Sequence, residues 1–405
     1  MLKLSHFWRH CMQNFFNSGL TQQQFLDEYW QKKPLLIRQA FVDFKSPISA
    51  DELAGLACEA DIESRLIKER GAEPWQVTCG PLEPEDFETL PESHWTILVQ
   101  DVDKHIPSLQ PLLAPFKFIP DWRRDDLMIS FAPEGGSVGA HTDSYDVFLL
   151  QAMGTRRWQI MHEPVYEAKL VDGIELKILA EFAADETWEL EPGDMLYMPP
   201  NIAHYGVALN DCMTFSIGFH APRQIEILDS LVNTCLEKGL DGRYYTDRDL
   251  ALAEQGSELT PQAIQRTKDL LHDLIEQSDD LLAESLGKLV TKVKPSLYEV
   301  AFLPDYELST PHLAKYFTQG DCYKNHYLQF AWSSHAEGGW LFSGGESYAV
   351  DKAGIPFLAL LCEKTVLTEQ DWFDINKNQS VVDVLRALIL NSGWFFKIEV
   401  EYYDD

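Results

Sequence analysis

Cysteine is scarce in this chain and forms no recognisable pattern. The 405 residues contain seven cysteines, namely Cys11, Cys58, Cys79, Cys212, Cys235, Cys322 and Cys362. Their number is odd and no two are spaced as CxxC. This argues against a disulfide framework and against a cysteine-rich zinc site, because both need closely patterned cysteines. It is typical of a protein in a reducing compartment.

Long apolar runs are also missing. No run approaches the roughly 18 residues that a membrane-spanning helix needs, and the N-terminus lacks the apolar region of a secretory signal peptide. Together with the scattered cysteines, these absences predict a soluble cytoplasmic protein that does not associate with a membrane.

Basic residues are few relative to acidic ones. Lysine and arginine number 33, aspartate and glutamate number 64, and the formal net charge is −31. A phosphate backbone repels such a surface, so direct binding of nucleic acid is not expected, and an anionic membrane is disfavoured for the same reason. A basic protein partner is favoured, with a simple role in solubility as the alternative.

The chain is long enough for two or three domains. Residues 1–222 form the first part, with a core at 95–220 where short apolar segments alternate with glycine and proline turns. The predicted strands are Trp95–Gln100, Leu127–Phe131, Val147–Met153, Arg157–Met161, Trp188–Leu190, Met195–Met198, Tyr205–Leu209 and Met213–Phe219. Many short strands at regular spacing indicate a β-sandwich or barrel.

The pattern becomes helical after Pro222. Residues 223–295 contain an amphipathic helix at Ile225–Lys238 and a helical pattern from Thr260 to about Leu289. Residues 296–405 mix short helices with strands and end in a strand at Trp394–Val400, an arrangement similar to a winged helix. This last part has 7 lysine and arginine residues against 16 aspartate and glutamate residues, so a role in protein contact is favoured over DNA binding.

His141 and Asp143 are the first candidates for chemistry. They follow a glycine-rich turn and are two residues apart. Side chains at this spacing on a strand point to the same face, so an imidazole and a carboxylate can bind one metal ion. An isolated HxD tripeptide is a weak signal, because it occurs often by chance.

A second motif strengthens this hypothesis. Pro192-Gly193 forms a turn before an apolar strand, Pro199-Pro200 closes that strand, and His204 follows. A jelly roll brings such a late strand beside an early one, so His204 would complete the set. Two imidazoles and one carboxylate form the facial triad of non-haem Fe(II) oxygenases and leave positions open for reactants. Hydrogen-bonded structural histidines are the alternative for each residue alone.

A cosubstrate for such an iron would need a cation. 2-Oxoglutarate supplies electrons by decarboxylation, and its distal carboxylate suits a buried guanidinium. Arg156 and Arg157 both lie on the strand after Val147–Met153. Adjacent strand residues face opposite ways, so only one of them can point inward. The residues alone leave open which one does.

These motifs together resemble the bacterial JmjC-type ribosomal oxygenases. The resemblance is densest over residues 120–220, and it rests on Asp126–Phe131, His141–Phe148, Gly154–Trp158 and Glu191–Pro200, with Tyr29–Leu36 and Asn391–Phe396 outside that stretch. One departure from the broader cupin pattern is Asn201, which stands where a glycine is usual.

The resemblance implies an α+β protein with three parts. They are a JmjC cupin with a double-stranded β-helix (jelly roll) at 1–222, a helical dimerisation segment at 223–295 and a winged-helix-like domain at 296–405. It also implies a homodimer that hydroxylates the β-carbon of an arginine in a basic large-subunit ribosomal protein, L-sixteen. Fe(II), 2-oxoglutarate and O₂ are then required.

The resemblance also places individual residues. His141, Asp143 and His204 correspond to the catalytic iron ligands, Arg156 to the cation that holds 2-oxoglutarate, and Ser130 to a hydroxyl that assists it. Tyr145 and Asp146 follow the ligands directly, so an acidic side chain there is a candidate contact for a substrate guanidinium. Structural packing is the equal alternative for Asp146.

Two other functions stay open at this point. The first is the same chemistry on another protein residue or on a small molecule. The second is a non-enzymatic cupin that binds a protein partner, which a complete triad together with Arg156 disfavours.

Overall fold

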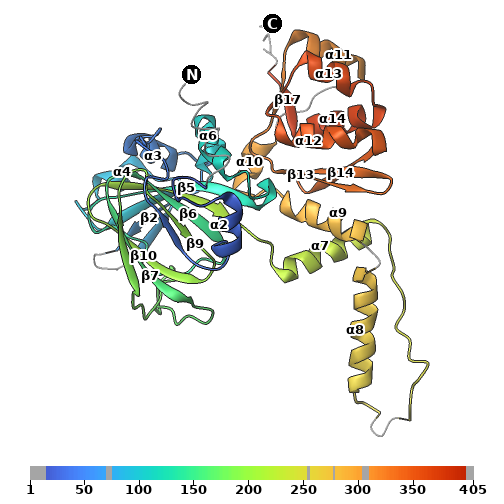
Figure 1. Cartoon of the computed structure of the whole chain (residues 1–405), viewed down its shortest axis with the longest axis horizontal. Coiled ribbons are helices and arrows are strands. Elements are labelled where there is room, and N and C mark those ends of the chain that lie inside the picture. The colour runs from blue at the N-terminus through green and yellow to red at the C-terminus, as the bar shows by residue number, and fades with distance from the viewer. Residues whose placement is uncertain (1–14, 70–74, 253–255, 277–278, 303–309, 398–405) are drawn as a thin grey trace. The chain divides into compact units, whose positions relative to one another are not determined.

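The computed structural model describes residues 15–69, 75–252, 256–276, 279–302 and 310–397. The chain divides into two compact units, which are Met1–Ala221 and Pro222–Asp405. Each unit is described by itself (Figure 1). Cys11 and the end of the predicted last strand, up to Val400, lie outside the described residues. The six described cysteines are all free. None of the helices in these ranges has the length and apolar character needed to cross a membrane.

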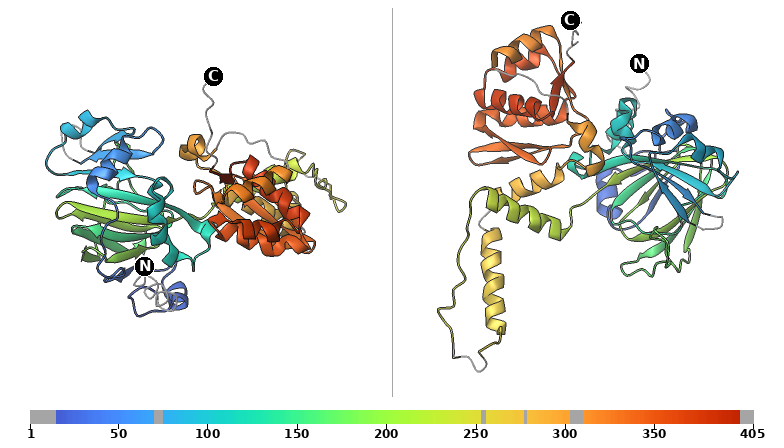
Figure 2. Two further views of the ribbon diagram at one scale, coloured as in Figure 1. Left: turned by 90° about the horizontal axis from the view of Figure 1, so that it is seen from above. Right: turned by 180° about the vertical axis from the view of Figure 1, so that it is seen from behind.

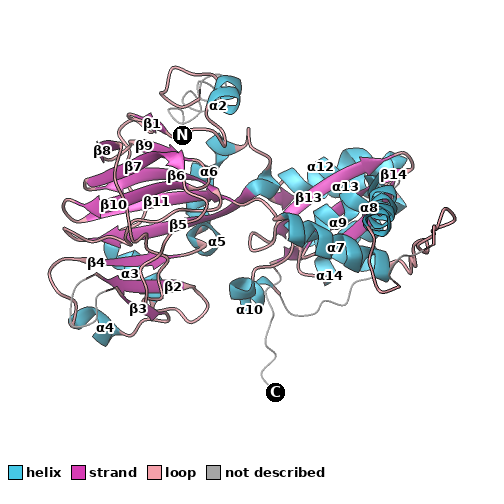
Figure 3. Ribbon diagram, turned by 90° about the horizontal axis from the view of Figure 1, so that it is seen from below, coloured by secondary structure: helices cyan, strands magenta, loops and turns pink. Residues whose placement is uncertain are grey.

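Two antiparallel sheets form the first unit. The large sheet has the strand order β1-β9-β6-β11-β5-β4-β2-β3 and the small sheet the order β10-β7-β8. The large-sheet strands are β1 (Leu35–Ile37), β2 (Ser64–Lys68), β3 (Gln76–Cys79), β4 (Trp95–Val99), β5 (Arg124–Ala132), β6 (Asp146–Met153), β9 (Met195–Met198) and β11 (Cys212–Phe219). The small-sheet strands are β7 (Arg156–Pro164), β8 (Glu186–Leu190) and β10 (Ile202–Ala208). Figure 3 shows the large-sheet strands side by side. All eight strands predicted between residues 95 and 220 are present, whereas β2 and β3 were not predicted.

Short helices accompany these sheets. They are α2 (Gln22–Glu28), α3 (Ala50–Ala57), α4 (Pro84–Glu88), α5 (Val102–His105) and α6 (Gln110–Leu113). A capping box starts α3, since the Ser49 hydroxyl accepts from the Glu52 backbone and the Glu52 carboxylate accepts from the Ser49 backbone. Figure 1 shows β7 and β10 on the opposite side of the unit from α3 and α6.

The large sheet therefore has two different faces. One face packs on the helices through a core rich in aromatic side chains, including Phe148, Phe215 and Phe219. The other face packs against the small sheet, and Val147 and Leu149 of β6 contact Trp158 there. We call these the helix-facing and the sheet-facing face. The alternation follows from the period of two residues in a strand.

The second unit combines helices with two further small sheets. Its helices are α7 (Gln224–Glu237), α8 (Pro261–Glu276), α9 (Asp279–Val290), α10 (Tyr298–Ala301), α11 (Thr310–Gln319), α12 (Ile355–Glu363), α13 (Glu369–Ile375) and α14 (Gln379–Leu390). Its sheets have the orders β13-β14-β15 and β16-β12-β17. Their strands are β12 (Cys322–Lys324), β13 (Phe330–His335), β14 (Gly338–Ser343), β15 (Glu346–Asp351), β16 (Val366–Leu367) and β17 (Trp394–Phe396).

Helix α9, from the predicted dimerisation segment, packs on the β13–β15 sheet, which belongs to the predicted C-terminal domain. In Figures 1 and 2, α9 and α12 lie on opposite faces of the β13–β15 sheet. A methyl group at Gly287 of α9 would lie 2.3 Å from the Phe342 ring of β14, so only glycine allows this close approach. Residues 222–405 accordingly form one compact unit in the structure, and the division into a dimerisation segment and a C-terminal domain stays a prediction.

Two helices cover most of the helical pattern predicted from Thr260 to Leu289. Helices α8 and α9 lie on either side of residues 277–278, which are outside the described ranges. Asp279 and Asp280 provide acidic side chains in the first turn of α9, where they favour a new helix N-terminus.

Candidate metal centre

The three predicted metal ligands meet at one place in the first unit. His141 pairs with His204 of β10 through two backbone hydrogen bonds, of 3.0 Å and 2.9 Å. One ligand atom from each of His141, Asp143 and His204 lies within 4.8 Å of the others. The jelly roll thus brings the early HxD motif beside the late histidine, as the sequence predicted.

Both imidazoles are oriented by backbone carbonyls. Nδ1 of His141 lies 2.9 Å from the Gly139 carbonyl oxygen, and Nδ1 of His204 lies 2.9 Å from that of Ile202. A carbonyl only accepts, so Nδ1 carries the proton and Nε2 is free to bind a metal. The two Nε2 atoms lie 3.9 Å and 3.5 Å from the carboxylate oxygens of Asp143. The two hydrogen bonds from Nδ1 to backbone carbonyls are outer-shell contacts of the kind that orient histidine ligands in metalloenzymes.

Burial also prepares His204 for metal binding. The residue is 2% exposed. Burial, reinforced by the neighbouring His141, lowers the pKa of His204 to about 4, although Asp143 acts in the opposite direction. The imidazole is therefore neutral at physiological pH, which is the form that coordinates a metal.

The loop before β10 is held by a residue with left-handed backbone. Asn201 has a φ of +64°, a conformation that asparagine tolerates better than most residues other than glycine. The backbone N–H of Asn201 donates to the Asp143 carbonyl at 2.7 Å, and its backbone carbonyl accepts from the Val165 N–H at 2.8 Å. The departure from the cupin pattern at position 201 thus keeps the backbone geometry that a glycine would provide.

The connection between β7 and β8 supports the HxD segment from the other side. The Leu179 amide donates to the Ala140 carbonyl at 2.8 Å. Gly139 has a φ of +82°, and a methyl group there would lie 2.6 Å from Ile178. The connection therefore contacts both residues that precede His141, including Gly139, whose carbonyl orients the imidazole. No motif in the sequence predicts this contact, because it joins two distant segments that share none.

The structure distinguishes the two candidate arginines. Arg157 is exposed and forms an ion pair with Glu189 at 2.9 Å. Arg156 is 3% exposed, and its Nε and Nη2 atoms have no hydrogen-bond partner among the described residues. A buried guanidinium with unpaired N–H groups is costly unless an anion is bound. Arg156 is thus the candidate that fits a bound carboxylate.

An indole lies between Arg156 and the metal ligands. The Trp158 ring centroid is 5.7 Å from Cζ of Arg156 and 5.8 Å from the His204 ring centroid. Gly206 is the cross-strand partner of Trp158, and a methyl group there would lie 2.6 Å from the indole. Sequence reasoning missed this pair, because Trp158 reads as an ordinary apolar strand residue.

Ser130 is buried on the sheet-facing face of the large sheet. It pairs with Thr214, which in turn pairs with Gln151, and the Thr214 hydroxyl donates to the Gln151 side chain at 3.1 Å. Three polar side chains thus form one row, and Thr214 and Gln151 were not predicted. One strand position away, Ala132 and Cys212 pack on Ala208, the cross-strand partner of Arg156. Ser130 therefore lies on the face of the large sheet that packs toward the strand of Arg156.

The contacts of Asp146 favour its structural alternative over a contact with substrate. Asp146 is fully buried, and its carboxylate accepts from Tyr197 at 2.6 Å and from Gln31 at 3.0 Å, with Arg123 at 3.4 Å. Burial raises the pKa of this carboxyl, although these partners oppose the shift. The structural alternative explains Asp146, because its acceptor sites already serve the protein.

Tyr145 lies on the opposite side of the chain from Asp146, at the sheet-facing face. A methyl group at Gly218 would lie 3.8 Å from the Tyr145 ring and 3.3 Å from Oδ1 of Asp126. The tyrosine ring and this carboxylate therefore both lie beside Gly218. Asp126 was not singled out in the sequence, although it begins one of the matching segments.

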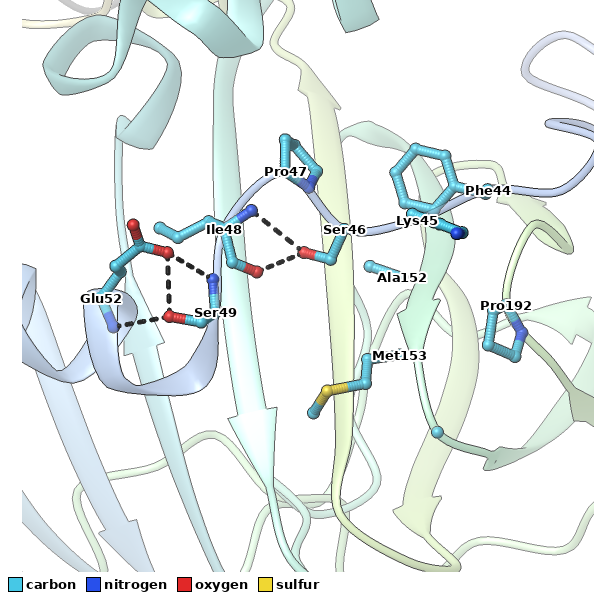
Figure 4. A pocket seen from close by; sticks show the side chains of 11 residues that line it. Phe44, Lys45, Ser46, Pro47, Ile48, Ser49, Glu52, Ala152, Met153 and Pro192 are labelled. Atoms are coloured by element: carbon cyan, nitrogen blue, oxygen red, sulfur yellow. Dashed lines mark hydrogen bonds between the residues drawn. The ribbon is translucent and has the colours of Figure 1, made fainter.

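The described residues fit a divalent metal with a dicarboxylate. The metal ligands are nitrogen and oxygen atoms without thiolate, as Fe(II) prefers, and the buried guanidinium of Arg156 is available for an anion. A separate recess of about 500 Å³ lies outside this site (Figure 4). It is lined by residues such as Phe44, Ile48 and Met153 and contains none of the predicted site residues.

Comparisons with known proteins identify related sequences. The family described as a JmjC domain matches residues 111–227. The ribosomal protein uL16 3-hydroxylase of Escherichia coli is 34% identical over 93% of this chain and 98% of its own length. A probable ribosomal oxygenase of Haemophilus influenzae is 38% identical over 66% of this chain and 65% of its own length.

Solved structures give the same result. The X-ray structure of E. coli ycfD has a TM-score of 0.78 at 32% identity, covering 93% of this chain and 98% of that one. The structure of YcfD, a ribosomal oxygenase from E. coli, in complex with cobalt and 2-oxoglutarate has a TM-score of 0.78 at 32% identity, covering 94% and 99%. This likeness confirms the JmjC cupin fold that the sequence predicted.

Proposed function

Because the chain belongs to the JmjC-domain ribosomal oxygenases, we propose that it is an Fe(II)- and 2-oxoglutarate-dependent protein hydroxylase. Its proposed reaction adds a hydroxyl group to the β-carbon of an arginine in ribosomal protein L-sixteen (uL16). The observation that carries this proposal is the pairing of the His141, Asp143 and His204 triad with the buried, unpaired guanidinium of Arg156. A binding module without catalysis has no need for either.

The chain's own residues would position the reactants. His141, Asp143 and His204 would hold Fe(II), and Arg156 would hold the distal carboxylate of 2-oxoglutarate, assisted by Ser130. When bound, iron, 2-oxoglutarate and O₂ supply the oxidising power, with succinate and CO₂ as by-products. The sheet-facing apolar side chains around Trp158 exclude water from this chemistry.

The substrate arginine would enter beside Tyr145. Asp126, whose carboxylate also accepts from the Asp101 backbone at 3.3 Å, lies beside Tyr145 at Gly218, and we assign the acidic contact to it. A guanidinium pairs well with a carboxylate, and a tyrosine ring can pack along its alkyl stem.

The second unit offers a surface for homodimerisation. Ser230 and Thr234 of α7 face α9, where the Ser230 hydroxyl donates to the Ser285 carbonyl. The opposite face of α7 exposes an apolar stripe, and α8 exposes another. These side chains are Ile225, Leu228, Val232 and Leu236 on α7, and Ile264, Leu271 and Ile275 on α8. Exposed apolar stripes of this kind mark protein interfaces, so we assign the homodimer contact to α7 and α8.

The net charge of −31 supports the remaining assignments. A basic ribosomal protein would be attracted to this surface, whereas nucleic acid would be repelled, so we propose recognition of the protein apart from RNA. A ribosomal substrate also places the enzyme in the cytoplasm. We expect kcat/KM for the intact substrate protein to fall as salt concentration rises, and a flat dependence would leave the charge to solubility alone.

The decisive experiment is mass spectrometry of ribosomal proteins from a strain that lacks this chain. We expect L-sixteen to lose the mass of one oxygen atom, and wild-type protein but not His141→Ala to restore it. If L-sixteen is unchanged while the purified protein still releases succinate with Fe(II), the chemistry stands and the substrate is a different one. If His141→Ala keeps full turnover, the metal assignment is wrong.

A further inference from the structure

Beside Arg156, Trp158 has a further buried N–H group that has no acceptor among the described residues. Its side chain is 4% exposed, and the indole Nε1–H has no hydrogen-bond partner among the described residues. Buried indole N–H groups usually find a partner, because leaving one unmade carries the full desolvation penalty. A missing partner at this position therefore needs an explanation.

The position of the indole beside Arg156 explains why its N–H group has no partner. Arg156 and Trp158 are two residues apart on β7 and point to the same face. Between them they present three buried donor nitrogens that have no acceptor among the described residues, namely Nε and Nη2 of Arg156 and Nε1 of Trp158. No metal can use an N–H donor, whereas a carboxylate has two oxygens that together accept several hydrogen bonds.

We propose that Trp158 is a cosubstrate-binding residue whose indole N–H donates to the carboxylate that Arg156 holds. This assignment rests on the proposed function, since it names one further contact of the same cosubstrate. Gly206 is part of the arrangement, because a methyl group there would lie 2.6 Å from the indole and displace it.

Trp394 provides a matched control within the chain. It is also fully buried, and its Nε1 also has no hydrogen-bond partner in the part of the chain that the structure describes. Its surroundings differ, because it belongs to the apolar core of the second unit. If a missing partner at a buried indole were only a feature of packing, both tryptophans would respond alike to loss of the N–H group.

The test is the substitution Trp158→Phe, which keeps an aromatic ring and removes the donor. Binding to the full-length Mn(II)-loaded protein is measured by titration calorimetry with 2-oxoglutarate and with pyruvate, a 2-oxo acid without the distal carboxylate. We expect the Kd for 2-oxoglutarate to rise about tenfold or more, as for a lost hydrogen bond to a charged group, and the Kd for pyruvate to stay unchanged. Trp394→Phe should change neither.

Other outcomes overturn the proposal. An unchanged Kd for 2-oxoglutarate in Trp158→Phe would show that the indole only fills space. An equal rise for 2-oxoglutarate and pyruvate would show that the ring supports the metal and not the distal carboxylate. Arg156→Ala separates this failure from failure of the proposed function. If that variant also binds 2-oxoglutarate normally, the cosubstrate site itself is misplaced.

Discussion

The two faces of the large sheet use the same strands for different purposes. On the helix-facing face, Phe148, Phe215 and Phe219 pack against one another and against the helices. On the sheet-facing face, the same strands carry the polar row of Ser130, Thr214 and Gln151. One face is closed by the protein's own apolar groups, and the other keeps polar groups inside a barrel.

This difference shows how the fold keeps stability and chemistry apart. Strand alternation places neighbouring residues on opposite faces, so a substitution on one face need not disturb the other. Arg156 and Arg157 show the same separation on β7, where one guanidinium is buried and unpaired and the next is exposed and paired with Glu189. Substitutions on the two faces should therefore have different consequences.

The largest effect is expected at the metal ligands. His204→Ala removes one of three ligands, so affinity for Mn(II) and the rate of succinate release should both fall by more than about a hundredfold, since even outer-shell changes reach that size. His162→Ala, an exposed histidine of β7, is the matched control and should keep both. Calorimetric metal binding at near-normal affinity in His204→Ala would contradict the site.

A change on the helix-facing face should act on stability. Phe148→Ala leaves a cavity among packed aromatic rings, so the free energy of unfolding should fall by about 3–5 kcal/mol. Urea unfolding followed by tryptophan fluorescence measures this loss. The folded variant should still bind Mn(II) with its normal affinity, and a large loss of affinity would show that the two faces are coupled.

A smaller effect is expected within the polar row. Thr214→Val keeps the side-chain shape and removes the hydroxyl that donates to Gln151, which should cost about 1 kcal/mol of stability. The same variant should weaken 2-oxoglutarate binding severalfold, because Gln151 and Ser130 lose a fixed neighbour. An unchanged Kd for 2-oxoglutarate in calorimetry would confine the row to a structural role.

The smallest effect is expected at Arg157. Its ion pair with Glu189 is exposed, and such pairs contribute little, so Arg157→Ala should change stability by no more than about 0.5 kcal/mol. Its Kd for 2-oxoglutarate should equal that of the wild type, in contrast to Arg156→Ala. If both arginine variants lose cosubstrate binding equally, alternation on β7 does not explain the site.

The sequence predicted the parts of the site that depend on local patterns. The HxD spacing identified His141 and Asp143, although in the structure His141 forms an isolated β-bridge and Asp143 follows it outside any strand. The turn residues around β9 place His204 on a later strand. Local patterns could not choose between Arg156 and Arg157, since alternation only says that they differ. Burial on the sheet-facing face makes that choice.

The parts that the sequence did not predict depend on distant segments. The hydrogen bonds that favour a structural role for Asp146 come from Tyr197 and Gln31, which lie far from it in the sequence. The position of the Trp158 indole depends on Gly206, because the β7–β10 register places this glycine opposite and leaves room for the ring. Likewise, β2 and β3 lack strong alternation and are strands because they extend an existing sheet edge.

The buried guanidinium of Arg156 also has a consequence for the lifetime of the protein. Buried N–H groups of a charged side chain that have no acceptor among the described residues penalise the folded chain, and an anion that binds only the folded form offsets that penalty. The metabolite consumed in the reaction would then also protect the enzyme from unfolding and proteolysis. The amount of enzyme in a cell would follow the supply of its own reactant.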